Sequence, residues 1–272
     1  MDQRPIGVFD SGLGGLTAAR TLEALLPGEN IIYFGDSRNA PYGTRAIPAL
    51  RTLAAANAGF LRSFDCKAIL VACGTVSSNA MEHLRKVYPE VPFFDVIDAA
   101  CDAAAQCAGR GPVAVAATEA TVRSGAFERA LHDRRGDARV ISKACQSLVA
   151  LAEQGHFAPE DPLAKAAVEA EFAPLRDAQP EALLLACTHF PLFAPLISAC
   201  MGPETRLLSV GEETAKALAA WLGAQNALAQ RAEGERRYFT SGDPAEFARL
   251  GAVFLGHTIT AEQHINRESE NL

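Results

Sequence analysis

Short runs of apolar residues alternate with longer amphipathic stretches along most of the chain. The apolar runs have the length of buried strands. We expect strands at Ile6–Phe9, Ile31–Phe34, Ala68–Ala72, Phe93–Val96, Val113–Ala116, Arg139–Ser142, Leu183–Ala186, Arg206–Ser209 and Tyr238–Thr240. The stretches between them place apolar residues at helical spacing, as in Leu16–Leu25, Ala49–Phe60 and Thr214–Leu222. Strands that alternate with helices predict parallel sheets with helices on both faces.

The same order of elements recurs weakly in the two halves of the chain. Ile6–Gly12 opens the first half and Val113–Thr118 opens the second. Each is followed, after a further helix and strand, by a strand that ends in Ala-Cys, at Cys73 and at Cys187. We therefore predict an α/β fold of two pseudo-symmetric lobes with mostly parallel sheets and the active site in the cleft between them. The first lobe is expected to comprise residues 1–97 plus 210–272, and the second residues 98–209.

The two Ala-Cys strand ends carry the candidate chemistry. Cys73 and Cys187 lie at the carboxyl ends of predicted buried strands, where α/β proteins hold their reactive groups. A lone strand-end cysteine is usually structural, but two in matched positions suggest an acid and a base that act on opposite faces of a substrate. Because a free thiol with a pKa of about 8.5 is only a few per cent ionised at pH 7, neighbours must assist. We expect Asp10, Glu153 and His189 to position or exchange protons.

Two loops follow strands and are candidates for ligand contact. Asp10–Thr17 is Gly-rich and opens a helix, yet it matches neither the dinucleotide fingerprint nor the P-loop, and Asp10 would repel a phosphate. We expect this turn to present Asp10 and Ser11 to a small ligand. In Tyr33–Thr44, Pro41 and Gly43 restrict the backbone, which favours a loop that shapes a pocket over an ordinary surface loop.

Composition and charge exclude several classes of function. The net charge of −7 argues against a nucleic-acid-binding protein, and no apolar run approaches the ~20 residues that span a bilayer. The seven cysteines lack the spacing of a disulfide framework, and no signal peptide precedes Pro5–Phe9, so we expect a cytoplasmic protein with reduced thiols. No compact Cys/His set suggests a metal site, and no lysine has a context that favours a Schiff base. Cys187 with His189 could alternatively serve as a hydrolase nucleophile and base.

These motifs resemble those of the cofactor-independent glutamate racemases of the aspartate/glutamate racemase superfamily. The similarity covers Gly7–Thr17, Tyr33–Arg45, Ile69–Ser78, Thr118–Leu131, Ala144–Gly155 and Leu183–Leu192. Asp-Ser-Gly, Pro-Tyr-Gly-Thr, Cys-x-Thr and Cys-Thr-His occur in the order and spacing of that family. The resemblance implies interconversion of L- and D-glutamate without a cofactor or a metal, and a supply of D-glutamate for peptidoglycan synthesis. It also implies a homodimer.

The resemblance also implies roles for individual residues. Cys73 would remove the α-proton from D-glutamate and Cys187 from L-glutamate, with Asp10, Glu153 and His189 as assisting groups. The further groups expected to bind the substrate are Ser11, Thr75 and Thr188 at its α-amino and α-carboxylate groups, the Pro41-Tyr42-Gly43 backbone with Thr118 and Thr121 at its side-chain carboxylate, and Gly74 beside Cys73.

Three departures from the family pattern leave the substrate open. Gly74 stands where Asn is usual, Gln146 follows Cys145 where Pro is usual, and Leu208–Gly211 replaces an Asp-Ser-Gly. Loss of one hydrogen bond to a charged ligand group costs about 1.5–3 kcal/mol, which would weaken substrate binding without abolishing it. A racemase of aspartate or another amino acid, a one-thiol decarboxylase and a non-catalytic ligand-binding or regulatory module of the same fold are the alternatives. The two intact thiols argue against the decarboxylase and the non-enzyme.

Overall fold

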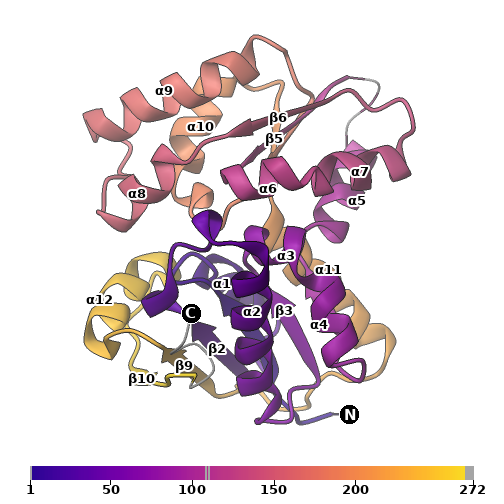
Figure 1. The fold of residues 1–272 in the computed structure, drawn as a ribbon, viewed down its shortest axis with the longest axis vertical. Coiled ribbons are helices and arrows are strands. Elements are labelled where there is room, and N and C mark those ends of the chain that lie inside the picture. The colour runs from indigo at the N-terminus through magenta and orange to yellow at the C-terminus, as the bar shows by residue number, and fades with distance from the viewer. Residues whose placement is uncertain (1, 108, 110, 267–272) are drawn as a thin grey trace.

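In the computed structural model, which describes residues 2–107, 109 and 111–266, two α/β lobes are stacked one above the other (Figure 1). The strands are β1 (Ile6–Asp10), β2 (Ile31–Gly35), β3 (Ala68–Val71), β4 (Phe93–Asp95), β5 (Val113–Ala117), β6 (Val140–Ala144), β7 (Ala182–Leu185), β8 (Arg206–Ser209), β9 (Arg236–Thr240) and β10 (Ala261–Gln263). The α-helices are α1 (Leu16–Leu25), α2 (Ile47–Arg62), α3 (Gly74–Asn79), α4 (Met81–Val87), α5 (Asp98–Cys107), α6 (Glu119–Ser124), α7 (Ala126–Arg134), α8 (Ser147–Glu153), α9 (Pro162–Arg176), α10 (Ala194–Met201), α11 (Val210–Ala224) and α12 (Pro244–Leu255). Short 3-10 helices are η1 (Ser37–Asn39), η2 (Tyr42–Thr44) and η3 (Phe190–Phe193).

The strands form two parallel sheets with the same internal order. One sheet runs β10-β9-β2-β1-β3-β4 and the other β6-β5-β7-β8. The order β2-β1-β3-β4 therefore recurs as β6-β5-β7-β8, and β3 corresponds to β7. This confirms the predicted fold class and the weak repeat in the sequence. The sequence did not predict β10, a short polar strand that pairs with β9.

Burial on both faces explains why the strands read as nearly continuous apolar runs. Every residue of β1 is buried. Ile6 and Val8 face one apolar cluster, which includes residues of α1, α11 and α12. Phe9 faces the opposite cluster, which includes residues of α2 and α4. Successive residues of a strand thus point to opposite faces of the sheet and pack against helices on both sides. This packing fixes the positions of the strand ends.

The chain crosses between the lobes at two neighbouring points. It leaves the first sheet after β4 and returns through α11, directly after β8. The Thr214 hydroxyl of α11 donates a hydrogen bond to the carbonyl of Asp95 in β4 (3.3 Å). Helix α11 packs on α1 and α5, and β9 then pairs with β2. Of the residues that the sequence assigned to the first lobe, Met1 and residues 267–272 lie outside the described part of the chain.

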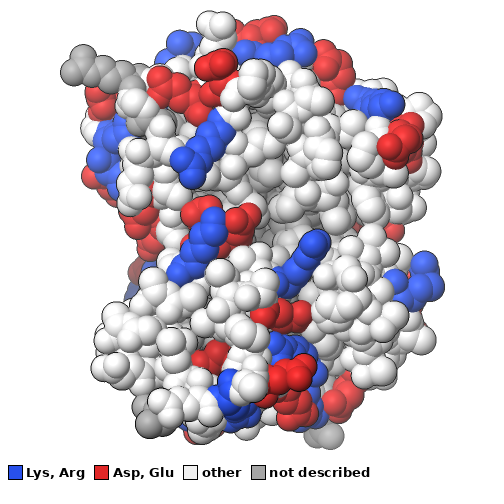
Figure 2. Space-filling model, turned by 180° about the vertical axis from the view of Figure 1, so that it is seen from behind, with Lys and Arg blue, Asp and Glu red and all other residues white. Residues whose placement is uncertain are grey.

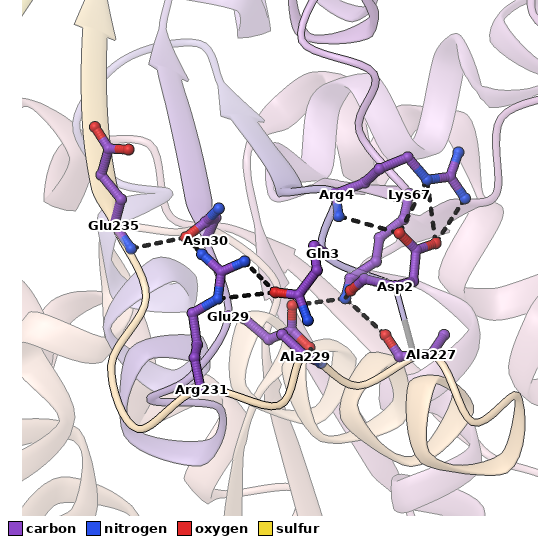
Figure 3. A network of polar contacts seen from close by, with 10 residues as sticks. All are labelled: Asp2, Gln3, Arg4, Glu29, Asn30, Lys67, Ala227, Ala229, Arg231 and Glu235. Carbon is purple, nitrogen blue, oxygen red and sulfur yellow. Dashed lines mark hydrogen bonds and ion pairs between the residues drawn. The ribbon is translucent and has the colours of Figure 1, made fainter.

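A buried ion pair ties the base of the first sheet to two distant segments (Figure 3). The ammonium of Lys67 lies 2.6 Å from the carboxylate of Glu29, and both side chains are almost completely buried. Lys67 also donates hydrogen bonds to the carbonyls of Asp2 (2.9 Å) and Ala227 (2.7 Å). The Glu29 carboxylate accepts one from the N–H of Ala229 (2.8 Å). The N-terminal segment and the connection from α11 to β9 are therefore both held by one lysine.

The surface charges are mixed. Figure 2 shows basic and acidic side chains interspersed over the back face, without an extended region of one sign. No helix in the described part of the chain has the length and apolar character that a membrane crossing requires.

Candidate active site

The two Ala-Cys strand ends meet at one cavity between the lobes. Cys73 lies two residues beyond β3 as the N-cap of α3, and Cys187 lies two residues beyond the matching strand β7. The residues that line this cavity are Ser11, Gly12, Ala40, Pro41, Tyr42, Gly43, Cys73, Gly74, Thr75, Thr118, Gln146, Val149, Glu153, Ala186, Cys187, Thr188 and His189. Its volume is about 40 Å³.

Cys73 is a buried thiol beside a buried carboxylate. Burial, and next the negative charge of Asp10, raise the pKa of the Cys73 thiol to about 12, although the N–H groups of Val76 and Thr75 at the start of α3 act in the opposite direction. Cys73 Sγ lies 3.7 Å from Ser11 Oγ. At neutral pH this thiol is protonated, and Asp10 is its neighbouring carboxylate.

The Gly-rich turn after β1 fixes Asp10. One carboxylate oxygen accepts hydrogen bonds from the N–H groups of Gly15 (3.0 Å) and Gly12 (3.3 Å), while the other oxygen is buried and has no hydrogen-bond partner within the part of the chain that the structure describes. A Cβ at Gly15 would lie 2.5 Å from the Cβ of Asp10, so only glycine permits this close turn. Burial raises the pKa of Asp10, which makes its carboxylate a stronger proton acceptor.

Cys187 has an imidazole neighbour instead of a carboxylate. Its Sγ lies 3.8 Å from Nδ1 of His189, and Nε2 of His189 lies 3.6 Å from the carboxylate of Glu153. Burial raises the pKa of the Cys187 thiol well above its usual value and lowers the pKa of His189 to about 4. The imidazole is therefore neutral and can accept a proton at Nδ1 when Nε2 carries the hydrogen. Burial and Asp10 raise the pKa of the half-exposed Glu153.

Hydroxyl groups from both lobes line the cavity between the thiols. Thr75 Oγ1 lies 3.2 Å from Thr118 Oγ1. The Thr118 hydroxyl in turn donates a hydrogen bond to Thr121 Oγ1 (3.0 Å). Thr188, next to Cys187 in the chain, is also buried and lines the cavity. Hydroxyls and the N–H groups at the start of α3 are donors suited to carboxylates.

One wall of the cavity is a loop held from behind by Asp36. This buried carboxylate accepts hydrogen bonds from Asn39 (3.0 Å), from Ser241 at the end of β9 (2.6 Å) and from the Tyr42 hydroxyl. Asn57 of α2 donates to the Tyr42 hydroxyl (2.9 Å). The backbone of residues 40–43 is thus positioned against the cavity.

The structure brings together most of the residues that the sequence proposed. Asp10 and Thr121 do not line the cavity: Asp10 lies behind Cys73, and Thr121 lies behind Thr118. The lining residues that were not expected there are Gly12, Ala40, Gln146, Val149 and Ala186. Nothing in the sequence indicated that Ala186, an apolar strand-end residue, would line the cavity. At position 146, Gln stands where the family usually has Pro, and this departure could have indicated a place in the site.

The other cysteines divide into two groups. Cys66, Cys101 and Cys145 are buried, whereas Cys107 and Cys200 are partly exposed. In the described residues, no group of three or more His, Cys, Asp or Glu side chains converges as metal ligands would. The chemistry that this arrangement supports is proton transfer by two thiols.

Comparisons with known proteins agree with this geometry. A model of the family described as Asp/Glu/hydantoin racemase matches residues 16–218. The glutamate racemase of Corynebacterium diphtheriae is 39% identical over 261 residues, which is 96% of this chain and 97% of that protein. The crystal structure of a glutamate racemase isoform from Bacillus anthracis superposes with a TM-score of 0.93 at 30% identity, covering 97% of this chain and 98% of that one. The glutamate racemase of Francisella tularensis in complex with D-glutamate gives a TM-score of 0.89 at 31% identity, covering 98% and 99%.

Proposed function

The chain belongs to the Asp/Glu/hydantoin racemase family, and on that premise we propose that it is an isomerase that interconverts L- and D-glutamate without a cofactor. Relatives named as glutamate racemases match nearly the whole chain, and one solved relative holds D-glutamate. This favours glutamate over aspartate or another amino acid. Two intact thiols at the site disfavour a non-catalytic module.

The matched position of Cys73 and Cys187 is the observation that supports this proposal most strongly. Inversion at the α-carbon needs a proton acceptor on one face and a proton donor on the other. Strands β3 and β7 occupy equivalent positions in the two sheets, and each delivers a thiol to the same cavity. A single thiol would be enough for a reaction that retains configuration.

In the proposed mechanism each thiol acts on one face. For D-glutamate, Cys73 loses its proton to Asp10, the thiolate removes the α-proton, and the Cys187 thiol protonates the carbanion from the opposite face to give L-glutamate. In the reverse direction, neutral His189 takes the proton of Cys187. Glu153 lies beside Nε2 of His189 and supports the tautomer that leaves Nδ1 free.

The remaining groups orient the substrate. Ser11, Thr75 and Thr188 are proposed to bind the α-amino and α-carboxylate groups. Thr118 and the Pro41-Tyr42-Gly43 backbone are proposed to bind the side-chain carboxylate, with Thr121 supporting Thr118 from behind. These donors offset the charge of two carboxylates in a buried site.

The activity is tested by incubation of the purified chain with L-glutamate, without added cofactor, while optical rotation is followed. We expect the signal to decay to zero as the racemic mixture forms, and the same end point from D-glutamate. Parallel reactions with L-aspartate and larger amino acids test the substrate. Turnover of another amino acid at least tenfold better than glutamate would contradict the proposed specificity.

The roles of the thiols are tested by isotope exchange in deuterated water. We expect the Cys187→Ser variant to exchange the α-hydrogen of D-glutamate slowly, without inversion, and to leave L-glutamate unchanged. The Cys73→Ser variant should show the opposite preference, and a Cys101→Ser variant should racemise as the wild type does. Proton NMR of each pure enantiomer measures the exchange. Exchange of both enantiomers by each active-site variant would contradict a face-specific mechanism.

The cellular setting is part of the same proposal. We propose that the enzyme acts in the cytoplasm, as a homodimer, and supplies D-glutamate for peptidoglycan synthesis. All seven cysteines are free, which is typical of a reducing compartment. Sedimentation analysis of the full chain tests the dimer, since a monomer at all accessible concentrations would contradict it.

A further inference from the structure

Two elements of the opposite lobe enclose the imidazole of His189. This residue follows β7 in the lobe of the four-stranded sheet and is buried. Phe254 of α12, in the lobe of the six-stranded sheet, meets its ring edge to face, with the ring centroids 6.0 Å apart and the planes at 84°. The Gly-rich turn lies near Nδ1, because a Cβ built on Gly14 would come within 3.0 Å of that atom. His189 therefore packs against an aromatic ring and a backbone turn of the other lobe.

Hydrogen bonds hold the orientation of this ring only weakly. Its Nε2 atom is buried and has no hydrogen-bond partner within the described part of the chain, and the half-exposed carboxylate of Glu153 lies 3.6 Å away. Its Nδ1 atom lies 3.8 Å from Cys187 Sγ. Because the second side-chain torsion of histidine has broad energy wells, these contacts alone would let the ring turn. Packing must therefore supply the orientation that the polar contacts do not.

Phe254 is a rigid support for that packing. It is 3% exposed and lies in one apolar cluster with Leu16 of α1. Its helix begins at the capping side chain of Asp243 and ends at Gly256, whose φ of +81° stops the helix two residues after Phe254. The edge of one aromatic ring against the face of another is also a favoured arrangement. The phenyl ring is thus fixed by its own lobe and can orient the imidazole of the other.

The two thiols differ in how their proposed proton acceptors are held. Asp10, beside Cys73, is fixed by backbone N–H groups of its own turn, whereas His189, beside Cys187, has no such bonds. We propose that Phe254 is a positioning residue for the Cys187 half of the reaction, because it holds the His189 ring with Nδ1 directed at Cys187 Sγ. The proton passes from Sγ to Nδ1, and Phe254 exchanges none. This inference rests on the proposed function and adds that one lobe orients the proton acceptor of the other.

Exchange by single-thiol variants tests this role one face at a time. In the Cys73→Ser background, L-glutamate exchanges its α-hydrogen through Cys187 and His189. Addition of Phe254→Leu should slow that exchange about 10- to 100-fold, since a small misplacement of a reacting group costs rate on that scale. In the Cys187→Ser background, D-glutamate exchanges through Cys73 and Asp10, and the same addition should change the rate less than threefold. Proton NMR in deuterated water measures both rates.

The matched control is Phe127→Leu in α7. Phe127 is also 3% exposed but lies in a separate apolar cluster, so the change removes the same atoms from a similarly buried site. Added to either background, it should leave the exchange of each enantiomer within threefold. An equal slowing of both enantiomers by Phe254→Leu would mean that this ring only stabilises the fold, and it would overturn the inference. Unchanged exchange of L-glutamate would overturn it as well.

The imidazole nitrogens provide a second readout that needs no turnover. In the wild-type chain with ¹⁵N-labelled histidine at pH 7, we expect the His189 signals of a single tautomer with the hydrogen on Nε2, assigned by their loss in His189→Gln. Phe254→Leu should shift both nitrogens toward the average of the two tautomers, and Phe127→Leu should not. A wild-type ring already averaged between tautomers would contradict the proposal without any Phe254 variant. If the wild-type chain does not turn over glutamate, the proposed function fails separately, and these signals still test the contact.

Discussion

Asp10 has two opposing effects on the Cys73 thiol, and an Asp10→Asn variant separates them. The negative charge of Asp10 raises the pKa of the thiol, whereas its carboxylate is the proposed acceptor of the thiol proton. With its pKa raised to about 12, the Cys73 side chain is almost entirely in the thiol form at pH 7. A nearby proton acceptor is therefore essential for the reaction.

The asparagine variant retains the shape of the turn but cannot take a proton. Its amide oxygen can still accept the hydrogen bond from the N–H of Gly15, so the fold should persist. Loss of the charge should lower the pKa of Cys73 and increase its thiolate fraction. Racemisation should nevertheless fall roughly 10²- to 10⁴-fold, the usual contribution of a positioned acid or base.

The assay compares these two quantities in the same protein. Alkylation of Cys73 by iodoacetamide is followed by peptide mass spectrometry at several pH values, and racemisation is followed by polarimetry. We expect faster alkylation and slower racemisation in Asp10→Asn than in the wild type. The control Asp243→Asn makes the same chemical change at the N-cap of α12 and should alter neither rate. Slower alkylation would refute the electrostatic argument, and more than about 10% residual racemisation would refute the role of Asp10 as proton acceptor.

Three further predictions concern stability and the cavity wall. Lys67→Met leaves Glu29 buried without its cation and should lower the free energy of unfolding by about 3–5 kcal/mol in urea titrations. A second change, Glu29→Leu, should restore part of that stability. A loss below about 1 kcal/mol in Lys67→Met would contradict this role of the ion pair. The hydrogen bond to Glu23 raises the pKa of His257, so its stabilisation is fully present below a pH of about 6.5 and is lost as the pH rises through the folded-state pKa. Because His257 is half exposed, His257→Gln should cost only a few tenths of a kcal/mol in urea at low pH and less at high pH; an equal cost at both would contradict this. Asp36→Asn removes an acceptor that holds the cavity loop and should raise the KM for glutamate more than it lowers kcat in steady-state kinetics, and a fall in kcat alone would contradict that role.

The sheets could be predicted from the sequence because parallel strands are buried on both faces. Such strands form apolar runs that polar turns delimit, as at Ile6–Phe9, where prediction and structure agree closely. The strand β10 could not be predicted in this way. Its residues are partly or fully exposed, and its place depends on pairing with β9, so its sequence carries no apolar period.

The candidate site was predictable where side chains carry the chemistry. Cys73 and Cys187 were visible because thiols stand out at the ends of apolar strands. The place of Ala186 in the cavity wall was not visible, because an apolar residue at the end of a buried strand carries no chemical signal. The position of Thr121 behind Thr118 depends on the packing of α6, which the spacing of two threonines does not determine.

The order of the strands has a consequence for biosynthesis. Strand β2 is the edge of its sheet until β9 pairs with it, yet β9 is made about 200 residues later. At a translation rate of about 5–20 residues per second, the edge of β2 remains open on the ribosome for about 10–40 s. The sheet β6-β5-β7-β8 is synthesised entirely within this interval and can complete its pairing first. An exposed strand edge invites pairing with other chains, so a nascent chain that stalls before Arg236 presents an open edge at β2 that favours aggregation.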